Sequence, residues 1–334
     1  MTQQRVVAVD LGGSKIVAAL VDSDGTIVDR ERVPTQADDG PEAVIQRVID
    51  AADRVIGRNR SATDNLCAIS IGAAGPVDMR NGIVSTPPNL PGWYTVPLRD
   101  ILHGHYGIDA FLINDAKAAA LGEHSFGAGR GLSNIVYITV STGIGGGIIA
   151  NGRLYTGHSG AAGEVGHMTI DINGHRCSCG NIGCWETLAS GTAMGREAAR
   201  RLASGEVSSL AVQFAGRFDK VTPVEIGEAA RNGDALAQGV VAWTARFLGV
   251  GLANLVNIFN PEMIIIGGGL SKLGNLLLEP AVKVVAERAF PLLNRAVRFV
   301  ASPLGDDATI LGAAAFALHK GKIQETPLPR HDRD

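Results

Sequence analysis

The sequence predicts an α/β protein of two domains, or of one large α/β unit. The chain has 334 residues, of which 46% are hydrophobic, so it is long enough to bury a large core. Short apolar runs typical of strands alternate with helical stretches. One plan (strand, glycine turn, strand, tight turn, strand) occurs twice, in residues 6–28 and 135–155. Gene duplication, which implies a cleft between two halves, and the coincidence of two hairpins explain this repeat about equally well.

The first half begins with the strands of the first repeat and continues with helix and strand in alternation. A helical stretch opens at Pro41, a residue favoured at the first position of a helix, and its apolar residues recur at three- and four-residue spacing. The alanines that follow Asp115 predict a second helix, 116–126. The predicted strands of this half are 6–10, 15–21, 26–32, 66–73 and 111–114.

The second half begins with the second repeat and is then mostly helical. Asn151-Gly152 is a pair preferred in tight hairpin turns. Prolines and charges from Gln324 onward predict a frayed tail. The predicted strands are 135–140, 147–150, 153–155, 263–266 and 297–301, and the predicted helices are 223–232, 235–259 and 308–320.

Composition argues against several classes of protein. The formal net charge is −3, which does not suit a protein that binds nucleic acid or another polyanion. The first ten residues lead directly into a strand, without the segments of a signal peptide. No apolar run is expected to cross a bilayer. We therefore expect a cytoplasmic protein without membrane or nucleic-acid partners, in which thiols stay reduced.

Three of the four cysteines stand within eight positions, in the segment GHRCSCGNIGCWE. Disulfides among them are disfavoured, because adjacent side chains point apart and a reducing compartment does not maintain the bond. Three thiolates need a fourth ligand to bind zinc tetrahedrally, and a nearby histidine would complete the set. A group of small buried residues or of redox-sensing thiols is the lesser alternative. The predicted zinc ligands are His167, Cys177, Cys179 and Cys184, whereas Cys67 is most simply a small core residue.

Two glutamates stand beside these ligands. Glu164 precedes His167 by three residues, and Glu186 follows Cys184 by two. Because such a zinc ion has no open coordination position, it would be structural and would hold both carboxylates near one place. Carboxylates accept hydrogen bonds from hydroxyl groups, so the pair suits a neutral polyhydroxyl ligand. Taken singly, each glutamate is more simply a solvated loop charge.

Three glycine-rich loops follow apolar strands: DLGGSK at 10–15, STGIGGG at 141–147 and GGG at 267–269. Backbone N–H groups at such strand ends can approach phosphate oxygens, and Asp10 would hold magnesium through water. Each loop alone is a weak signal, because neither the Walker A motif nor the dinucleotide fingerprint is present. Together they are better explained by a nucleotide than by three unrelated turns.

Asp115 stands where a strand meets a helix, directly after Asn114. One interpretation is that Asp115 caps the helix, since aspartate is preferred there. The other is that it serves as the base of a phosphotransferase, accepting the proton of a sugar hydroxyl. The residues themselves favour neither.

The combined motifs resemble one known family, the ROK group (repressor, open reading frame, kinase) of sugar kinases. The resemblance spans almost the whole chain, and its most specific part pairs EVGH with CxCGxxGCxE. It implies the actin/hexokinase-like (ribonuclease H-like) two-domain ATPase fold with a ligand cleft between the domains. The small domain would be 1–113 plus about 316–334, and the large domain, with the zinc loop, 114–315. The matching stretches are VDLGGSK, GAAGPVD, TPPNLPGW, INDAKAAALGE, TVSTGIGGGIIANGRLYTGHSGAAGEVGH, CSCGNIGCWE and IIIGGGLS.

The resemblance implies phosphorylation of a hexose at its 6-hydroxyl, with ATP and Mg²⁺ and with a structural Zn²⁺. Glucose is the first choice of sugar, and N-acetylmannosamine and N-acetylglucosamine are the alternatives. Asp115 would be the catalytic base. The sugar hydroxyls would contact Asn89, Asn114, Glu164, His167 and Glu186, so that His167 serves both zinc and sugar. The ATP phosphates would face Gly12, Gly13, Ser14, Lys15, Thr142, Gly143 and Gly145, and Gly267 and Gly268 would flank the nucleoside.

The family also contains DNA-binding repressors that sense sugars, which carry a winged helix ahead of the first phosphate loop. Asp10 lies ten residues from the start, which leaves no space for that domain, and the presence of Asp115 also favours an enzyme. Ser14 stands where the family usually has Thr, which keeps the hydroxyl. Ala73-Ala74 replaces a Pro-Gly pair next to the sugar, which bears on sugar preference. Such kinases are commonly homodimers or homotetramers, with 235–259 as a candidate interface or, equally, a core helix.

Overall fold

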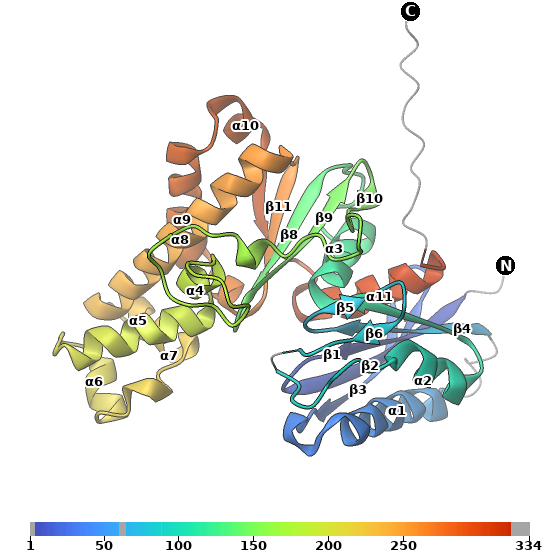
Figure 1. Cartoon of the computed structure of the whole chain (residues 1–334). Helices are drawn as coiled ribbons and strands as arrows, with labels where there is room; N and C mark the ends of the chain where they lie inside the picture. The colour runs from blue at the N-terminus through green and yellow to red at the C-terminus, as the bar shows by residue number, and fades with distance from the viewer. Residues whose placement is uncertain (1–3, 60–64, 88, 322–334) are drawn as a thin grey trace, which may run out of the picture. The chain divides into compact units, whose positions relative to one another are not determined.

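The computed structural model describes residues 4–59, 65–87 and 89–321, so the tail from Gln324 lies outside it. Within these residues the chain forms two five-stranded sheets with helices packed on them (Figure 1). It divides into two compact units: unit 1 is 1–137, 147–163 and 303–334, and unit 2 is 138–146 and 164–302. Unit 1 thus includes 114–137, which the predicted division assigns to the large domain. That division itself stays a prediction.

The first sheet lies in unit 1 and has the strand order β3-β2-β1-β4-β7. Its first three strands form an antiparallel meander, and β4 and β7 continue the sheet parallel to β1. Residues 6–9 of β1 are fully buried, as their unbroken apolar run predicts. The bounds are β1 (Arg5–Leu11), β2 (Lys15–Asp22), β3 (Ile27–Pro34), β4 (Leu66–Ala73) and β7 (Asp109–Asn114). Between β4 and β7 in the sequence, β5 (Val77–Asp78) and β6 (Ile83–Val84) form a separate two-stranded antiparallel sheet.

The second sheet has the order β10-β9-β8-β11-β12, which repeats the strand order of the first. The turn between β9 and β10 holds Asn151 at φ 52° and Gly152 at φ 74°, the conformation that an Asn-Gly hairpin requires. The identical order of the two sheets favours duplication over coincidence. The division between the units falls within β8 and β9. The bounds are β8 (Ile135–Val140), β9 (Ile144–Ala150), β10 (Arg153–Leu154), β11 (Met263–Gly267) and β12 (Arg298–Ala301).

Two helices of unit 1 approach each other closely at glycines (Figure 1). A Cβ on Gly312 would lie 1.6 Å from the carbonyl oxygen of Ala118, and a Cβ on Gly122 would lie 2.3 Å from that of Ala308. No larger residue fits, so this crossing fixes the helix that begins with Asp115 against the terminal helix. The helices of the described part of unit 1 are α1 (Pro41–Arg58), α2 (Leu98–Tyr106), α3 (Asp115–Phe126) and α11 (Ala308–Leu318), with short 3₁₀ turns η1 (Ala37–Asp39) and η6 (Gly305–Asp307).

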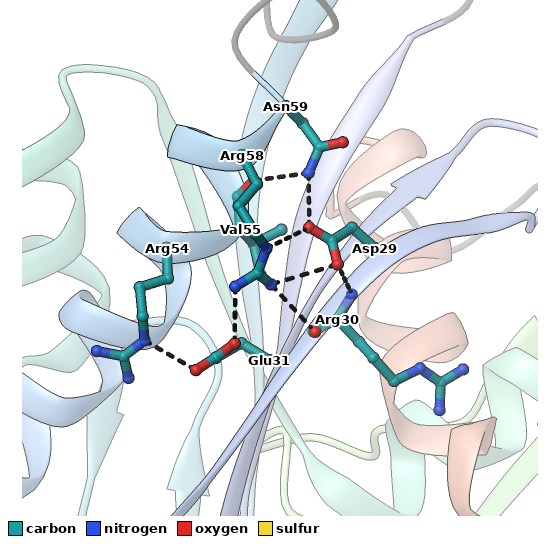
Figure 2. A network of polar contacts seen from close by, with 7 residues as sticks. All are labelled: Asp29, Arg30, Glu31, Arg54, Val55, Arg58 and Asn59. Carbon is teal, nitrogen blue, oxygen red and sulfur yellow. Dashed lines mark hydrogen bonds and ion pairs between the residues drawn. The ribbon is translucent and has the colours of Figure 1, made fainter.

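The edge strand β3 pairs its exposed charges with α1 (Figure 2). The guanidinium of Arg58 donates to Asp29 and to Glu31, each at 2.8 Å, and Arg54 donates to Glu31 at 2.9 Å. Hydrogen bonds from Arg58 are the largest cause of the lowered pKa of both carboxyl groups. Charged side chains on an edge strand also discourage pairing with another chain.

The long helix α8 (Ala235–Phe259) has the predicted bounds and forms the core of unit 2, where it contacts α4, α5, α7 and α9. By length and composition α8 is apolar enough to cross a membrane, but 61% of its most apolar window is buried inside the protein, as in a core helix. The other helices of unit 2 are α4 (Glu186–Ala189), α5 (Gly191–Ala203), α6 (Ser209–Phe214), α7 (Pro223–Arg231), α9 (Asn275–Arg288) and α10 (Pro291–Ala296), with 3₁₀ turns η3 (Val165–His167), η4 (Phe218–Lys220) and η5 (Gly269–Leu273).

Most predicted elements are confirmed, and the differences have local causes. β9 begins at Ile144 rather than at residue 147, because its three glycines adopt an extended conformation. The second phosphate loop is therefore only Ser141–Gly143, and Gly145 lies within β9. The sequence patterns above do not predict α2, α5 or α9, each of which contains an internal glycine or, in α9, Pro280.

Candidate functional site

The turn between β1 and β2 is clamped by Thr35. The N–H of Gly12 donates to the carbonyl of Lys15 at 3.0 Å, which closes the turn. The Thr35 hydroxyl donates to the carbonyl of Gly12 at 2.7 Å, and the Thr35 N–H donates to that of Ser14 at 3.1 Å. Thr35 is fully buried, so water does not compete for these bonds. Gly12, Gly13, Ser14 and Lys15 thus form one fixed turn at a strand end.

Asn89 lies beside this turn, on an exposed part of a loop. Leu90 and Trp93, each 1% exposed, anchor the loop in the core. The N–H of Thr86 closes it by donating to the carbonyl of Trp93 at 2.7 Å. A Cβ on Gly13 would lie 2.5 Å from Cβ of Asn89, so only glycine allows this approach. The structure therefore joins a predicted sugar ligand to a predicted phosphate loop.

Asn114 and Asp115 share the junction of β7 and α3, and Asn114 is the cap. Its Oδ1 accepts from the N–H groups of Ala116 and Lys117 at 3.1 and 3.2 Å, and its amide donates to the carbonyl of Gly75 at 3.2 Å. The capping role considered for Asp115 therefore belongs to Asn114. Asp115 is the first residue of α3 and is half-buried; its Oδ1 accepts from the N–H of Ala116 at 2.8 Å. A carboxylate is stabilised at this end of a helix.

Asp10 lies close enough to Asp115 for their charges to interact. Burial raises the pKa of Asp10 to about 7; the charges of Asp115 and Asp306 act in the same direction, and that of Lys15 opposes them. A carboxyl group whose pKa lies near neutral pH and that stands beside a second carboxylate is typical of functional sites. Such a pair also suits a cation, whose charge would offset both.

The four predicted metal ligands converge in unit 2. Their ligand atoms all lie within 4.8 Å of one another. Sγ of Cys179 is 3.7 Å from Sγ of Cys184, too far for a disulfide, and Sγ of Cys177 is 3.6 Å from Nδ1 of His167. Zinc–sulfur bonds of about 2.3 Å in a tetrahedron place two sulfurs about 3.8 Å apart, so the donor set fits a zinc ion. Cys67, in contrast, is a half-buried free thiol in unit 1.

The thiols of this cluster differ in their tendency to ionise. Burial raises the pKa of Cys177 to about 12, whereas the backbone N–H of Asn181 lowers the pKa of Cys179. A metal ion displaces such protons when it binds, because thiolates are the ligands. Binding of a cation by this cluster would therefore release protons.

Glu186 points its carboxylate at the metal ligands. Oε1 lies 3.3 Å from Sγ of Cys177 and 3.8 Å from Nδ1 of His167, and Oε2 accepts from the N–H of Ile144 at 3.2 Å. Glu164 is exposed, directly before η3, which ends in His167. Both glutamates thus stand on segments that the cluster holds.

The second phosphate loop docks on the first turn of α5. The N–H of Ser141 donates to the carbonyl of Gly143 at 2.9 Å and closes the loop. The N–H of Gly191 donates to the carbonyl of Ser141 at 2.7 Å, and the hydroxyl of Thr192 donates to that of Thr142 at 2.8 Å. The loop and α5 are therefore one assembly.

A cavity of about 820 Å³ lies within unit 2 beside this loop. Ser141, Thr142 and Gly269 form part of its wall. Gly267 and Gly268, predicted to flank a nucleoside, are not among its lining residues. Gly268 packs against the end of β8 instead, where its Cβ would lie 2.6 Å from the carbonyl of Val140. The size suits a small-molecule ligand such as a nucleoside.

Sequence reasoning missed the apolar wall of this cavity. Its residues come from α5, α7, η5 and the segment before α7, so no short motif holds them together. The sequence feature that could have located this wall is the N-terminus of α7, where Thr222 and Glu225 form a capping box around Pro223. The apolar wall residues are Ala199, Val221, Pro223, Val224, Leu270 and Leu273.

Comparison with known proteins finds similar proteins over nearly the whole chain. The sequence model of the ROK family matches residues 6–320. The chain is similar to the glucokinase of Thermotoga maritima, with 40% identity over 316 residues that cover 95% of this chain and 98% of that protein. It is also similar to the xylose repressor of Caldicellulosiruptor bescii, with 34% identity covering 94% of this chain and 78% of the repressor.

Among solved structures, a ROK family glucokinase from Streptomyces griseus in complex with glucose and AMPPNP has a TM-score of 0.81 at 36% identity. The match covers 95% of this chain and 100% of that one. The predicted actin/hexokinase-like fold is thereby confirmed.

Proposed function

This chain belongs to the ROK family, and on that premise we propose that it is a kinase that transfers the γ-phosphoryl group of ATP to the 6-hydroxyl of glucose. One observation carries the proposal most directly. The charge of Asp115, at the start of α3, acts on Asp10, at the phosphate turn of the same unit. A base and a carboxylate suited to a cation, together beside a phosphate loop, are parts that phosphoryl transfer requires.

The nucleotide of this proposal occupies the cavity of unit 2. Its base and ribose pack against the apolar wall, and its phosphates extend to Thr142 and Gly143. Asp10 would hold Mg²⁺ through water, and the ion would supply positive charge to the phosphate oxygens. The AMPPNP complex of the Streptomyces griseus relative supports a nucleotide ligand for this family member.

Asp115 acts as the general base of the reaction. It accepts the proton of the sugar 6-hydroxyl while that oxygen forms a bond to the γ-phosphorus. The bond from the γ-phosphorus to the bridging oxygen breaks, and ADP leaves with the electron pair. The other sugar hydroxyls are oriented so that the 6-hydroxyl lies in line. The residues proposed to hold them are Asn89, Glu164, His167, Glu186 and, through its second amide hydrogen, Asn114.

The cysteine–histidine cluster is proposed to bind a structural zinc ion. Nδ1 of His167 faces the sulfurs, which leaves Nε2 for a sugar hydroxyl. The ion fixes the segments that carry Glu164 and Glu186. Thiolate ligands persist in a reducing compartment, so we place the protein in the cytoplasm.

A homodimer or homotetramer is proposed to form through an apolar face of unit 2. The rings of Trp243 and Phe247 on α8 stack edge-to-face with centroids 5.0 Å apart. The start of α10, a helix that contacts α8, adds Phe290 and Leu292, which are 62% and 68% exposed. Light scattering at several concentrations tests this, because a monomer at all of them contradicts it.

A coupled assay of ADP release with glucose, mannose, N-acetylglucosamine and N-acetylmannosamine tests the function. We expect the highest kcat/KM with glucose. Asp115→Asn keeps the shape of the side chain but not the base, so kcat should fall by about 10²–10⁴-fold while glucose still binds. Near-normal turnover by this variant removes Asp115 from the role of base.

Two alternatives are separated by the same assay. Greater kcat/KM with an N-acetylhexosamine makes the protein an N-acetylmannosamine or N-acetylglucosamine kinase. The similarity to a xylose repressor favours a second class, a sugar-sensing regulator. A protein that binds sugar without turnover of ATP belongs to that class.

A further inference from the structure

Both halves of the predicted metal cluster lie beside one residue, Ile144, which directly follows the phosphate loop Ser141–Gly143 and begins β9. The N–H of Ile144 donates to Oε2 of Glu186, two residues after the ligand Cys184. From the other side, Gly166 stands directly before the ligand His167, and a Cβ on it would lie 2.0 Å from the carbonyl oxygen of Ile144. Ile144 is 6% exposed, so these contacts are shielded from water. Ile144, the residue that follows the loop, is therefore held at its N–H group by Glu186 and at its carbonyl group by Gly166.

Glu186 itself is rigidly mounted. It follows Trp185, whose side chain is fully buried and whose indole N–H donates to the carbonyl of Phe247 at 2.9 Å. The indole occupies space that only Gly251 of α8 leaves, since a Cβ there would lie 2.0 Å from the ring. With Cys184 buried in the cysteine–histidine cluster on one side and Trp185 fixed in the core, the backbone of Glu186 has little freedom.

The carboxylate of Glu186 also limits the loop at Gly143. A Cβ on Gly143 would lie 2.4 Å from Oε2, the same oxygen that accepts from the next residue along the chain. The backbone of the loop therefore rests on this carboxylate. A charged acceptor makes a hydrogen bond to a backbone N–H roughly twice as strong as a neutral one.

We propose that the metal cluster braces the nucleotide phosphate loop, Ser141–Gly143, through Glu186 and Gly166. Glu186 is then a positioning residue for ATP, beyond its proposed contact with sugar. This inference rests on the proposed function, in which the loop binds ATP phosphates. If the cluster serves the sugar alone, changing Glu186 or removing the ion will not alter the nucleotide affinity measured without sugar. If the cluster braces the loop, either change will weaken nucleotide binding.

The test is the dissociation constant of AMPPNP with Mg²⁺, measured by calorimetry without sugar on the zinc-loaded full chain. Glu186→Ala removes the acceptor and should weaken binding about tenfold. Glu186→Gln keeps a carbonyl acceptor for Ile144 and should stay within about threefold of the wild type. Glu164→Ala is the matched control, because Glu164 is also a proposed sugar ligand but is exposed and stands three residues before His167; it should leave the dissociation constant of AMPPNP unchanged.

Hydrogen exchange of the Ile144 amide supplies a second readout. Removal of zinc by a chelator should speed this exchange and weaken AMPPNP binding, whereas exchange in the buried strand β1 should not change. If chelation unfolds the protein, the zinc-loaded Glu186 variants still decide the question. Equal AMPPNP affinity and equal Ile144 exchange in wild type and Glu186→Ala overturn the brace. Failure of the wild type to bind AMPPNP at all overturns the proposed function instead.

Discussion

The two glycine loops occupy the same place in sheets of the same strand order, yet different chemistry supports them. The loop after β1 is clamped by the neutral, buried hydroxyl of Thr35. The loop after β8 rests on the charged carboxylate of Glu186, which also lies beside metal ligands. The two sheets thus place a glycine loop at the same position, but different residues support the loop in each.

Because their supports differ, the conformations of the two loops should respond to different conditions. Thr35 has no predicted metal ligand beside it among the described contacts, and its carbonyl accepts from Arg47, which stays charged, at 3.0 Å. The first loop should therefore keep its conformation whatever occupies the cysteine cluster. The first loop nevertheless carries a titratable residue of its own, Asp10. We therefore expect the first loop to respond to pH and the second to metal.

The largest effect should follow Asp10→Asn. Loss of the carboxylate should lower kcat by about 10²–10³-fold, because the charge of the magnesium ion is no longer held at the first loop. The same change should raise the thermal stability of the magnesium-free, nucleotide-free protein at pH 8.

The sign of this stability change follows from the pKa. The pKa of Asp10 is about 7 in the folded protein, above the ordinary 3.8. The neutral form is therefore favoured by folding, and this stabilisation is complete below pH 3.8 and is lost as the pH rises through 7. Melting curves should show the gain of the Asn variant shrinking from pH 8 to pH 5. A gain independent of pH contradicts the raised pKa.

Gly13→Ala should have the next largest effect. The new Cβ would lie 2.5 Å from Cβ and 2.9 Å from the carbonyl oxygen of Asn89, so the loop must move. We expect a loss of about 1–3 kcal/mol in urea unfolding and a raised KM for sugar. Gly12→Ala is the matched control for stability, because its nearest neighbour, the carbonyl of Lys15, is at 3.4 Å. Equal losses in the two variants would show that Asn89 does not press on the turn.

Thr35→Val sharpens the comparison of the supports. The change keeps the shape of the side chain and leaves the carbonyl of Gly12 without its hydroxyl donor, which should cost about 1–2 kcal/mol. Urea unfolding measures this loss, and metal analysis should find the zinc content unchanged. Loss of zinc from this variant would mean that the two supports are not independent.

The smallest effect should follow Arg58→Ala, which removes the centre of the network in Figure 2. These pairs are exposed, so their contribution is screened by solvent and salt. A slight drop in melting temperature at low salt should disappear in 1 M salt, with kinase activity unchanged. A large drop that persists in salt would mean that β3 depends on this network.

The cluster of His167 with three cysteines and the glycine turns could be located from the sequence because each is local. His167 and the three cysteines lie within eighteen positions, and their residue types alone specify soft, tetrahedral coordination. The repeated meander also predicted the strands, since apolar runs broken by glycine turns have few other ways to fold. The resemblance to the ROK family supplied the roles proposed for Asn89 and Asp115.

The capping role of Asn114 and the contact of Asn89 with Gly13 could not be predicted. Asn114 and Asp115 are both good caps, and only the backbone at the end of β7 decides which of them lies outside the helix. Nothing in the sequence near Gly13 points to Asn89. The cavity wall is scattered over four segments for the same reason.

By itself the sequence determined the family, the alternation of strands and helices, the three glycine loops and the four side chains proposed to bind a metal. These follow from neighbouring residues, through hydrophobic periodicity and ligand chemistry. Only the tertiary structure decided that Thr35 supports one loop and Glu186 the other, and that Ile144 lies between the two halves of the metal cluster. Such contacts join residues far apart along the chain, and packing, rather than local preference, selects them.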